Sequence, residues 1–192
     1  FIQYQPQLDL HTGRIVGAEA LLRWQHPAEG LISPAEFIPA SEANGMIIPI
    51  SNWLIREVCQ QALLWRKQGL APFVVAVNCS AVQFRQGDLV AEVRQALEES
   101  GLPAHLLELE LTESMLLQDS ERVMLIISQL KALGVKLSID DFGTGYSNMA
   151  YLKRFAVDKL KIDQSFVKGI ARNPDDEAIV QSIITLAHSF NL

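Results

Sequence analysis

The sequence has few of the residues that build thiolate or histidine metal sites and disulfide frameworks. Its 192 residues include two cysteines, Cys59 and Cys79, and four scattered histidines. Two cysteines form neither a disulfide framework nor a ligand cluster, and no two histidines have the spacing of a His-x-x-x-His pair. These absences argue against zinc and favour a reducing compartment, where the cysteines act as small buried hydrophobic residues.

Long apolar runs and an excess of basic residues are also missing. No run approaches the ~20 apolar residues that cross a bilayer, and no signal-peptide pattern is present. Because 22 acidic residues oppose 16 Lys and Arg residues, the formal charge is −6. This balance argues against DNA or RNA as a partner, although bound divalent cations would still admit an anionic substrate. We expect a soluble cytoplasmic chain, either free or as the output domain of a membrane-attached protein.

Instead, the sequence has the composition of one globular domain with an α/β order of segments. It is 49% apolar and 20% charged, and its length allows a sizeable core. The turn His11-Thr12-Gly13-Arg14 predicts an antiparallel pair of strands, Ile2 to Leu10 and Ile15 to Trp24. A polar loop with several prolines follows, and then a helix at about Ser51 to Gln68, which Gly69 ends.

Strand-like and helix-like patterns alternate in the rest of the chain. Ser80 and Gln83 form a capping box for one helix that carries Val82, Leu89, Val93 and Leu97. This alternation predicts a parallel sheet with crossover helices. The further strands are expected at residues 73–77, 106–111, 135–139 and 157–162, and the further helices at residues 119–133, 148–154 and 175–190.

The order of segments favours a closed barrel over an open doubly wound sheet. No glycine-rich dinucleotide fingerprint follows the first strand, which argues against the doubly wound fold. A (β/α)8 barrel typically has ~250 residues, and about six strand units can be counted here. We therefore predict a TIM-like barrel with an antiparallel first strand, as a single domain over residues 1–192 that stops before its last two strand units.

Polar residues recur where the predicted strands end. If these strands are parallel, their carboxyl ends gather on one face, where barrel enzymes place their active sites. One carboxylate, Glu19, instead interrupts an otherwise apolar strand, where burial without a partner is costly. The strand-end residues are Asn78, Glu110, Asp140, Asp141, Lys161 and Asp163.

The recurrence of these residues, rather than any one of them, indicates a site. A single strand-end Asp, Glu or Asn is most often a cap or a solvated loop residue. By the same reasoning Lys159 is interpreted as solvent-facing, and Glu108 as paired with a neighbour. Carboxylates gathered at one rim repel each other unless they are protonated or bridged by cations. An all-oxygen cluster suits Mg²⁺ or Mn²⁺ better than zinc.

Short motifs follow each other in a fixed order over essentially the whole chain. The first are Tyr4-Gln5-Pro6, Glu19-Ala20-Leu21, Phe37-Ile38-Pro39 and Val77-Asn78-Cys79-Ser80. Glu110 to Ser114, Asp140 to Ser147 and Leu160 to Phe166 come next. This ordered set resembles the EAL-domain family of cyclic di-GMP phosphodiesterases. The family takes its name from the tripeptide that stands here as Glu19-Ala20-Leu21.

The resemblance implies two-metal hydrolysis of cyclic di-GMP to linear pGpG, with two Mg²⁺ or Mn²⁺ ions. Lys161 would orient the attacking water, while Arg23, Gln5 and Asp163 would bind the substrate. Glu113 would brace the loop of residues 140–147, which couples metal binding to dimerisation in this family. A homodimer and fusion to sensor or cyclase domains are also implied. The implied metal ligands are Glu19, Asn78, Glu110, Asp140 and Asp141, with Glu19 and the two aspartates also catalytic.

The chain departs from the family pattern in a few places. Cys79 stands where Leu is usual, and Asn148-Met149 replaces the commoner Ser-Leu. A later metal-binding Glu and a Gln near the water do not occur within 192 residues, which would fit a fragment of a longer protein. The alternative function is a catalytically inactive cyclic di-GMP receptor that regulates a neighbouring domain.

Overall fold

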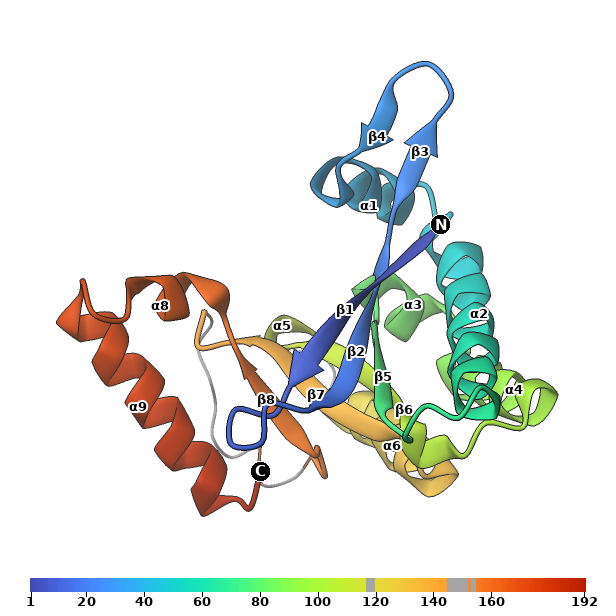
Figure 1. Ribbon diagram of the computed structural model, residues 1–192. Coiled ribbons are helices and arrows are strands. Elements are labelled where there is room, and N and C mark those ends of the chain that lie inside the picture. Colours follow the sequence, from blue (N-terminus) through green and yellow to red (C-terminus); the bar gives the residue numbers. More distant parts are fainter. Residues whose placement is uncertain (117–119, 145–151, 153–154) are drawn as a thin grey trace.

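The structure, a computed structural model, describes residues 1–116, 120–144, 152 and 155–192. A six-stranded sheet in the order β1-β2-β5-β6-β7-β8 curves as a half-barrel (Figure 1). Only β1 is antiparallel to its neighbour, and the other pairs are parallel, which confirms the expected α/β architecture. These strands are β1 (Ile2–Leu8), β2 (Ile15–Leu22), β5 (Val74–Asn78), β6 (Leu107–Thr112), β7 (Lys136–Phe142) and β8 (Lys159–Ile162).

Helices cover the outer face of the sheet and extend beyond β8. α2, α4 and α6 form one layer, in which α2 contacts α4 and α4 contacts α6. None of the helices in the described ranges is both long enough and apolar enough to cross a bilayer. The helices are α1 (Pro34–Ala43), α2 (Ile47–Lys67), α3 (Ala81–Gln86), α4 (Leu89–Ser100), α5 (Glu113–Leu116), α6 (Ser120–Leu133), α8 (Gln164–Gly169) and α9 (Pro174–Ser189).

The two faces of the sheet differ in chemistry because side chains alternate along each strand. On the outer face, Val77, Leu109 and Ile139 are fully buried within the main core. Each such side chain contributes about 1.5–3 kcal/mol by leaving water. The inner face carries polar residues instead: Gln5, Glu19, Asn78, Glu108, Glu110, Ser138, Asp140, Lys159 and Lys161.

The loop expected after β2 contains regular structure, so that prediction was wrong. A short hairpin of β3 (Trp24–His26) and β4 (Gly30–Ile32) leads into α1. Ser33 is the N-cap of α1, and its side chain accepts a hydrogen bond from the Ala35 N–H. Pro34 follows in the first turn, where a missing N–H costs nothing. In this context the proline begins a helix rather than marking a loop.

The single helix expected after Ser80 is two helices, α3 and α4. Gly87 ends the first, and Asp88 begins the second by accepting a hydrogen bond from the Ala91 N–H. Ser80 caps α3 as expected, but Gln83 does not complete a capping box. Its side-chain amide donates instead to Asn52, 3.0 Å away, and is 1% exposed.

The remaining boundaries differ from the predictions by a few residues. α2 begins at Ile47 rather than at about Ser51. Its first turn has no side-chain cap, so the sequence carried no signal for this start. β7 continues to Phe142, past its expected end at residue 139. The short helix expected at residues 148–154 lies outside the described residues, apart from Leu152.

Lys159 was expected to face solvent, and its side chain is 39% exposed, but its ammonium forms an ion pair that the sequence did not suggest. Its Nζ lies 2.8 Å from both carboxylate oxygens of Glu108, whose side chain is 1% exposed. The interpretation of Glu108 as paired with a neighbour is confirmed. This ion pair lies on the inner face, two residues before Glu110 and Lys161 along their strands. Its two opposite charges neutralise each other there.

Removing Lys159 leaves the buried Glu108 carboxylate without its counterion. We expect Lys159→Met to lower the free energy of unfolding by about 1–3 kcal/mol, measured by urea denaturation. The double variant Glu108→Leu/Lys159→Met recovers most of the loss, because neither charge then remains. Lys168→Met, at an exposed position of α8, is the control and changes stability by less than about 0.5 kcal/mol. A Lys159→Met variant as stable as the wild type would show that solvent alone neutralises Glu108.

Candidate functional site

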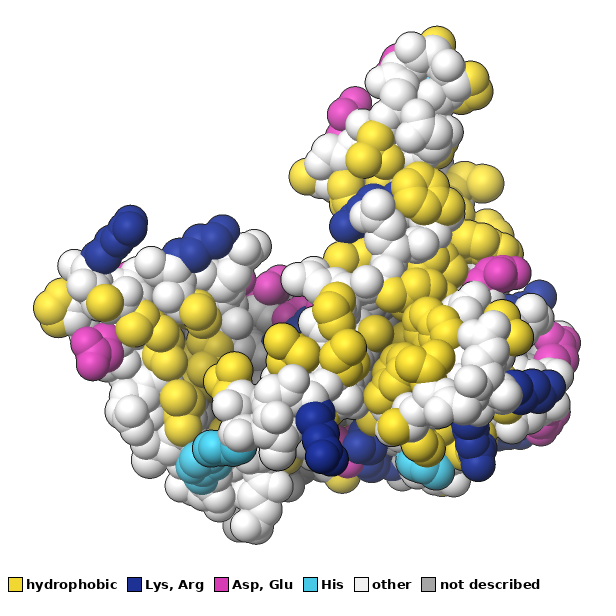
Figure 2. All heavy atoms as spheres, viewed as in Figure 1, with side chains coloured by type: hydrophobic (Ala, Val, Ile, Leu, Met, Phe, Trp, Pro, Cys, Tyr) yellow, Lys and Arg dark blue, Asp and Glu magenta, His cyan; other side chains and the backbone are white. Residues whose placement is uncertain are grey.

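The carboxyl ends of the parallel strands bring the candidate residues together on the inner face. Asn78 ends β5 and pairs in register with Glu110 of β6. Glu19 lies on the adjacent strand β2, where it pairs with Gln5 of β1 on one side. The hairpin β3–β4, α1 and α8 extend from this end of the sheet (Figure 1). Acidic side chains are visible in the hollow beside α8 (Figure 2).

The ammonium of Lys161 is the centre of the cluster. Its side chain reaches from β8 into a group of carboxylates from three other strands. Nζ lies 3.2 Å from Glu19 Oε2, 2.5 Å from Glu110 Oε2 and 3.2 Å from Asp140 Oδ2.

Most of the other carboxylate oxygens in the cluster are also engaged. The Asn78 amide donates to Glu19 Oε1 at 2.7 Å. The backbone N–H of Asp141 donates to Asp140 Oδ1 at 3.0 Å. Glu110 Oε1, in contrast, is buried with no hydrogen-bond partner among the described residues. Leaving such an atom unpaired is unfavourable, so this oxygen is available to a further ligand.

An irregular register between β7 and β8 positions the two aspartates. Ile139 pairs with Leu160 and Phe142 with Ile162, so Asp140 and Asp141 together oppose Lys161 alone. This is the geometry of a β-bulge, which redirects side chains beside many active sites. Asp141 has a φ of 53°, in the left-handed region that residues other than glycine rarely adopt.

The charges of the cluster do not balance. With Glu19, Glu110 and Asp140 all ionised, three negative charges face one positive charge from Lys161, which leaves −3 + 1 = −2. Burial raises the pKa of Glu110 to about 7, although the neighbouring Lys161 opposes that shift. Burial lowers the pKa of Lys161, but the Glu110, Asp140 and Glu19 carboxylates outweigh it and raise that pKa. The ammonium therefore stays charged, and the site favours additional positive charge.

The donor atoms fit a hard divalent cation. All of the predicted ligands offer carboxylate or amide oxygens, which Mg²⁺ and Mn²⁺ prefer. The unpartnered Glu110 Oε1 supports such a ligand role. Among the described residues, however, no three Asp, Glu, His or Cys side chains are grouped closely enough to hold an ion. The Lys161 ammonium lies between three of these carboxylates.

A cavity of about 340 Å³ adjoins the cluster and extends toward α1 and α2. Arg23 and Asn78 line its polar part, and the Glu42 carboxylate there accepts a hydrogen bond of 2.7 Å from the Ser80 hydroxyl. Burial raises the pKa of the Cys79 thiol, which also lines the cavity, to about 12. The apolar walls include Ala20, Leu22, Ile38 and Leu54.

Arg23 also borders a second, open cavity against β1. Its Nε donates to Gln3 Oε1 at 2.8 Å, and its Nη1 donates to the Leu22 carbonyl at 3.0 Å. Gln3 and Gln5 line the same cavity, two residues apart on one face of the strand. Sequence reasoning missed Gln3, although strand periodicity from Gln5 gave the signal. Glu42 was missed as well, since it lay at the end of a region expected to be a loop.

Two further predicted residues lie at the edges of the cluster. Asp163 is the N-cap of α8, where hydrogen bonds from Ser165 lower its pKa. Its predicted contact with substrate stays a prediction. Glu113 begins α5, and its Oε2 accepts a hydrogen bond of 3.2 Å from the Gly143 N–H. This bond ties the end of β6 to the residue that follows β7.

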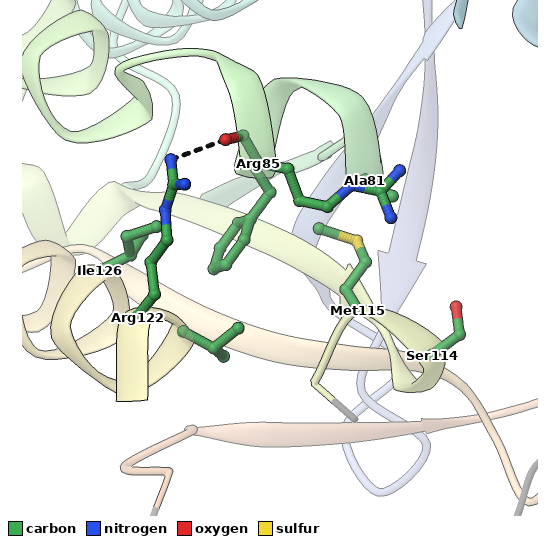
Figure 3. A pocket seen from close by; sticks show the side chains of 8 residues that line it. Ala81, Arg85, Ser114, Met115, Arg122 and Ile126 are labelled. Carbon is green, nitrogen blue, oxygen red and sulfur yellow. Dashed lines mark hydrogen bonds between the residues drawn. The ribbon is translucent and has the colours of Figure 1, made fainter. Parts of the chain in front are cut away.

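Another pocket of about 170 Å³ lies between α3, α5 and α6 (Figure 3). Its walls are mainly apolar, and Arg122 Nη2 donates to the Arg85 carbonyl at 2.6 Å across one end. It contains none of the predicted site residues. The strand-end cluster with its adjoining cavities is therefore the candidate active site.

Comparison with known proteins identifies similar sequences. MucR of Pseudomonas aeruginosa, a bifunctional diguanylate cyclase/cyclic di-GMP phosphodiesterase, is 46% identical over 192 residues. NbdA of the same organism, a cyclic di-GMP phosphodiesterase, is 44% identical over 191 residues. The match covers 100% of this chain in both cases, but only 28% and 24% of these relatives.

The fold agrees equally closely with a solved structure. The PaMucR phosphodiesterase, solved in complex with c-di-GMP, has a TM-score of 0.96 and 45% identity. The similarity covers 100% of this chain and 78% of that one. The family profile described as EAL domain matches residues 1–192. The chain belongs to the EAL domain family.

Proposed function

We propose that the protein hydrolyses cyclic di-GMP to linear pGpG. The observation that carries this proposal is the convergence of Glu19, Glu110 and Asp140 on one point, the Lys161 ammonium. Relatives with phosphodiesterase activity, and a neighbouring fold solved with c-di-GMP, support the same reaction. Water would add to phosphorus as one phosphorus–oxygen bond to ribose breaks, and its proton would pass to the leaving ribose oxygen.

Two divalent ions, Mg²⁺ or Mn²⁺, are part of the proposal. When bound, they supply a water that is acidic enough to attack near neutral pH and positive charge against the phosphate oxygens. The donor set that would hold them is Glu19, Asn78, Glu110, Asp140 and Asp141, which offers oxygen atoms throughout. Such ions also explain how an acidic chain would accept an anionic substrate.

The chain's own residues would bind and orient the reactants. Arg23 presents a planar donor fork that suits a phosphate, and Gln5 offers an amide on the same side. The cavity of about 340 Å³ beside Asn78 has apolar walls suited to one nucleobase half of the substrate. Lys161 would donate a hydrogen bond to the attacking water and so fix its direction. Asp163 would add a contact to the substrate from the start of α8.

The wider assembly is proposed from the relatives. Their greater length supports fusion of this chain to further domains, with sensor or cyclase roles. We also propose a homodimer in which the Glu113–Gly143 hydrogen bond transmits the state of the site. A cytoplasmic location fits an intracellular nucleotide substrate.

Removing one carboxylate charge from the cluster tests the metal assignment. We expect Asp140→Asn in the full-length protein to lower hydrolysis by at least about 10²-fold, while thermal unfolding changes little. Release of the linear dinucleotide in Mg²⁺ or Mn²⁺ is followed by chromatography. Asp88→Asn, at the exposed N-cap of α4, is the control, because asparagine caps equally well there. Full activity of Asp140→Asn would contradict the assignment, and binding of cyclic di-GMP without turnover by the wild type would favour a receptor.

The role of Arg23 is tested by keeping its charge but changing its shape. We expect Arg23→Lys to raise KM for cyclic di-GMP about tenfold with a smaller effect on kcat, since two parallel hydrogen bonds become one. Steady-state kinetics in saturating Mn²⁺ measure both constants. Arg94→Lys, at an exposed position of α4, leaves them unchanged. A selective loss of kcat would instead place Arg23 at the reacting phosphate oxygens.

A further inference from the structure

The hydrogen bonds of the carboxylate cluster leave little room for a second cation. The Lys161 ammonium contacts one oxygen of each of Glu19, Glu110 and Asp140. The second oxygens of Glu19 and Asp140 accept hydrogen bonds from Asn78 and from the Asp141 N–H. Only the second oxygen of Glu110 has no partner among the described residues. An ion that binds all three carboxylates at the point where they converge would therefore lie where the Lys161 ammonium now lies.

We propose that Lys161 is an internal cation that occupies the metal-binding position, so that a divalent ion must displace its ammonium to bind. This inference rests on the proposed function, because it concerns the same site. The ammonium would hold the carboxylates together while metal is absent. After displacement it would lie at the edge of the site, where it can reach the attacking water.

The position of Lys161 allows such a movement. Its side chain is 22% exposed, whereas that of Glu110 is fully buried. β8 is the last strand of the six-stranded sheet, and among the described strands it pairs only with β7. The lysine side chain has four rotatable carbon–carbon bonds and a compact, readily hydrated head group, so it can withdraw toward water without moving the strand.

Lys159 provides a comparison within the same strand. It faces the same side as Lys161, and its ammonium is held by Glu108 one layer below the rim. Glu108 is outside the proposed ligand set, and one ammonium fully balances its single charge. The Lys159 pair therefore has no reason to open when a metal binds. Lys159 thus has the same charge as Lys161, but its ammonium does not lie among the proposed metal ligands.

The inference is tested by measuring Mn²⁺ binding and thermal unfolding of the full-length protein. We expect Lys161→Met to bind Mn²⁺ at least about tenfold more tightly by calorimetry, because no ammonium has to leave. In EDTA the same variant unfolds at a lower temperature than the wild type, because its carboxylates have lost their internal cation. Lys161→Gln, which removes the charge but keeps a donor, shifts both measurements in the same directions.

Lys159→Met is the matched control. It lowers the unfolding temperature with and without Mn²⁺ and leaves the affinity for Mn²⁺ unchanged. An equal gain in affinity for Lys159→Met would show that charge alone matters, and would overturn the inference that Lys161 occupies the position. Unchanged or weaker Mn²⁺ binding by both Lys161 variants would overturn it as well.

These outcomes separate the inference from the proposed function. If the wild type binds Mn²⁺ and hydrolyses cyclic di-GMP while the Lys161 variants show no gain in affinity, only the inference fails. If the wild type neither binds Mn²⁺ nor hydrolyses the nucleotide, the proposed function fails. In that second case, Mn²⁺ binding by the Lys161 variants alone would still support displacement of the ammonium. If the Lys161 variants do not bind Mn²⁺ either, both the inference and the proposed function fail.

Discussion

Like charge gathered at one end of the sheet is the constraint on which the rest of the structure depends. Glu19, Glu110 and Asp140 come from three strands, and Glu110 is wholly removed from solvent. Carboxylates in such a place repel each other and lose hydration, so they persist only where one is protonated or a positive charge lies among them. Lys161 supplies that charge in part. The remaining imbalance would favour the divalent cations of the proposed function. The outer face of the sheet must provide the stability that the inner face does not.

Strand periodicity resolves the conflict between a stable sheet and a charged site. In β6 the leucines at positions 107, 109 and 111 are fully buried in the core, while Glu108 and Glu110 alternate with them on the inner face. The same alternation in β5 places Asn78 beside Glu110. Because a shift of one residue would exchange the two faces, the apolar contacts with α2, α4 and α6 fix the register of the charged residues. The core thus sets the register that positions the charged residues.

This coupling explains how much the sequence could reveal. The order of strands, the antiparallel first pair and the gathering of strand-end residues all follow from local patterns. The bulge at Asp140 and Asp141 does not, because it depends on pairing with β8, whose residues come some distance later in the chain. The ion pair of Lys159 was missed for a related reason, since its partner Glu108 lies 51 residues away. α1 was missed because Pro34 was taken as a loop residue, whereas the preceding Ser33 makes it the first turn of a helix.

Two lysines on one short strand show how a small difference in surroundings separates structure from function. Lys159 meets one carboxylate, and their charges cancel one layer below the rim. Lys161 meets three, and the bulge adds Asp141 to the same rim, so its single charge cannot cancel theirs. The charges of the lower pair balance. The upper group is left with an unpaired oxygen on Glu110 and an excess of carboxylates. Under the proposed function, this incompleteness would let an acidic chain bind cations and, through them, an anionic nucleotide.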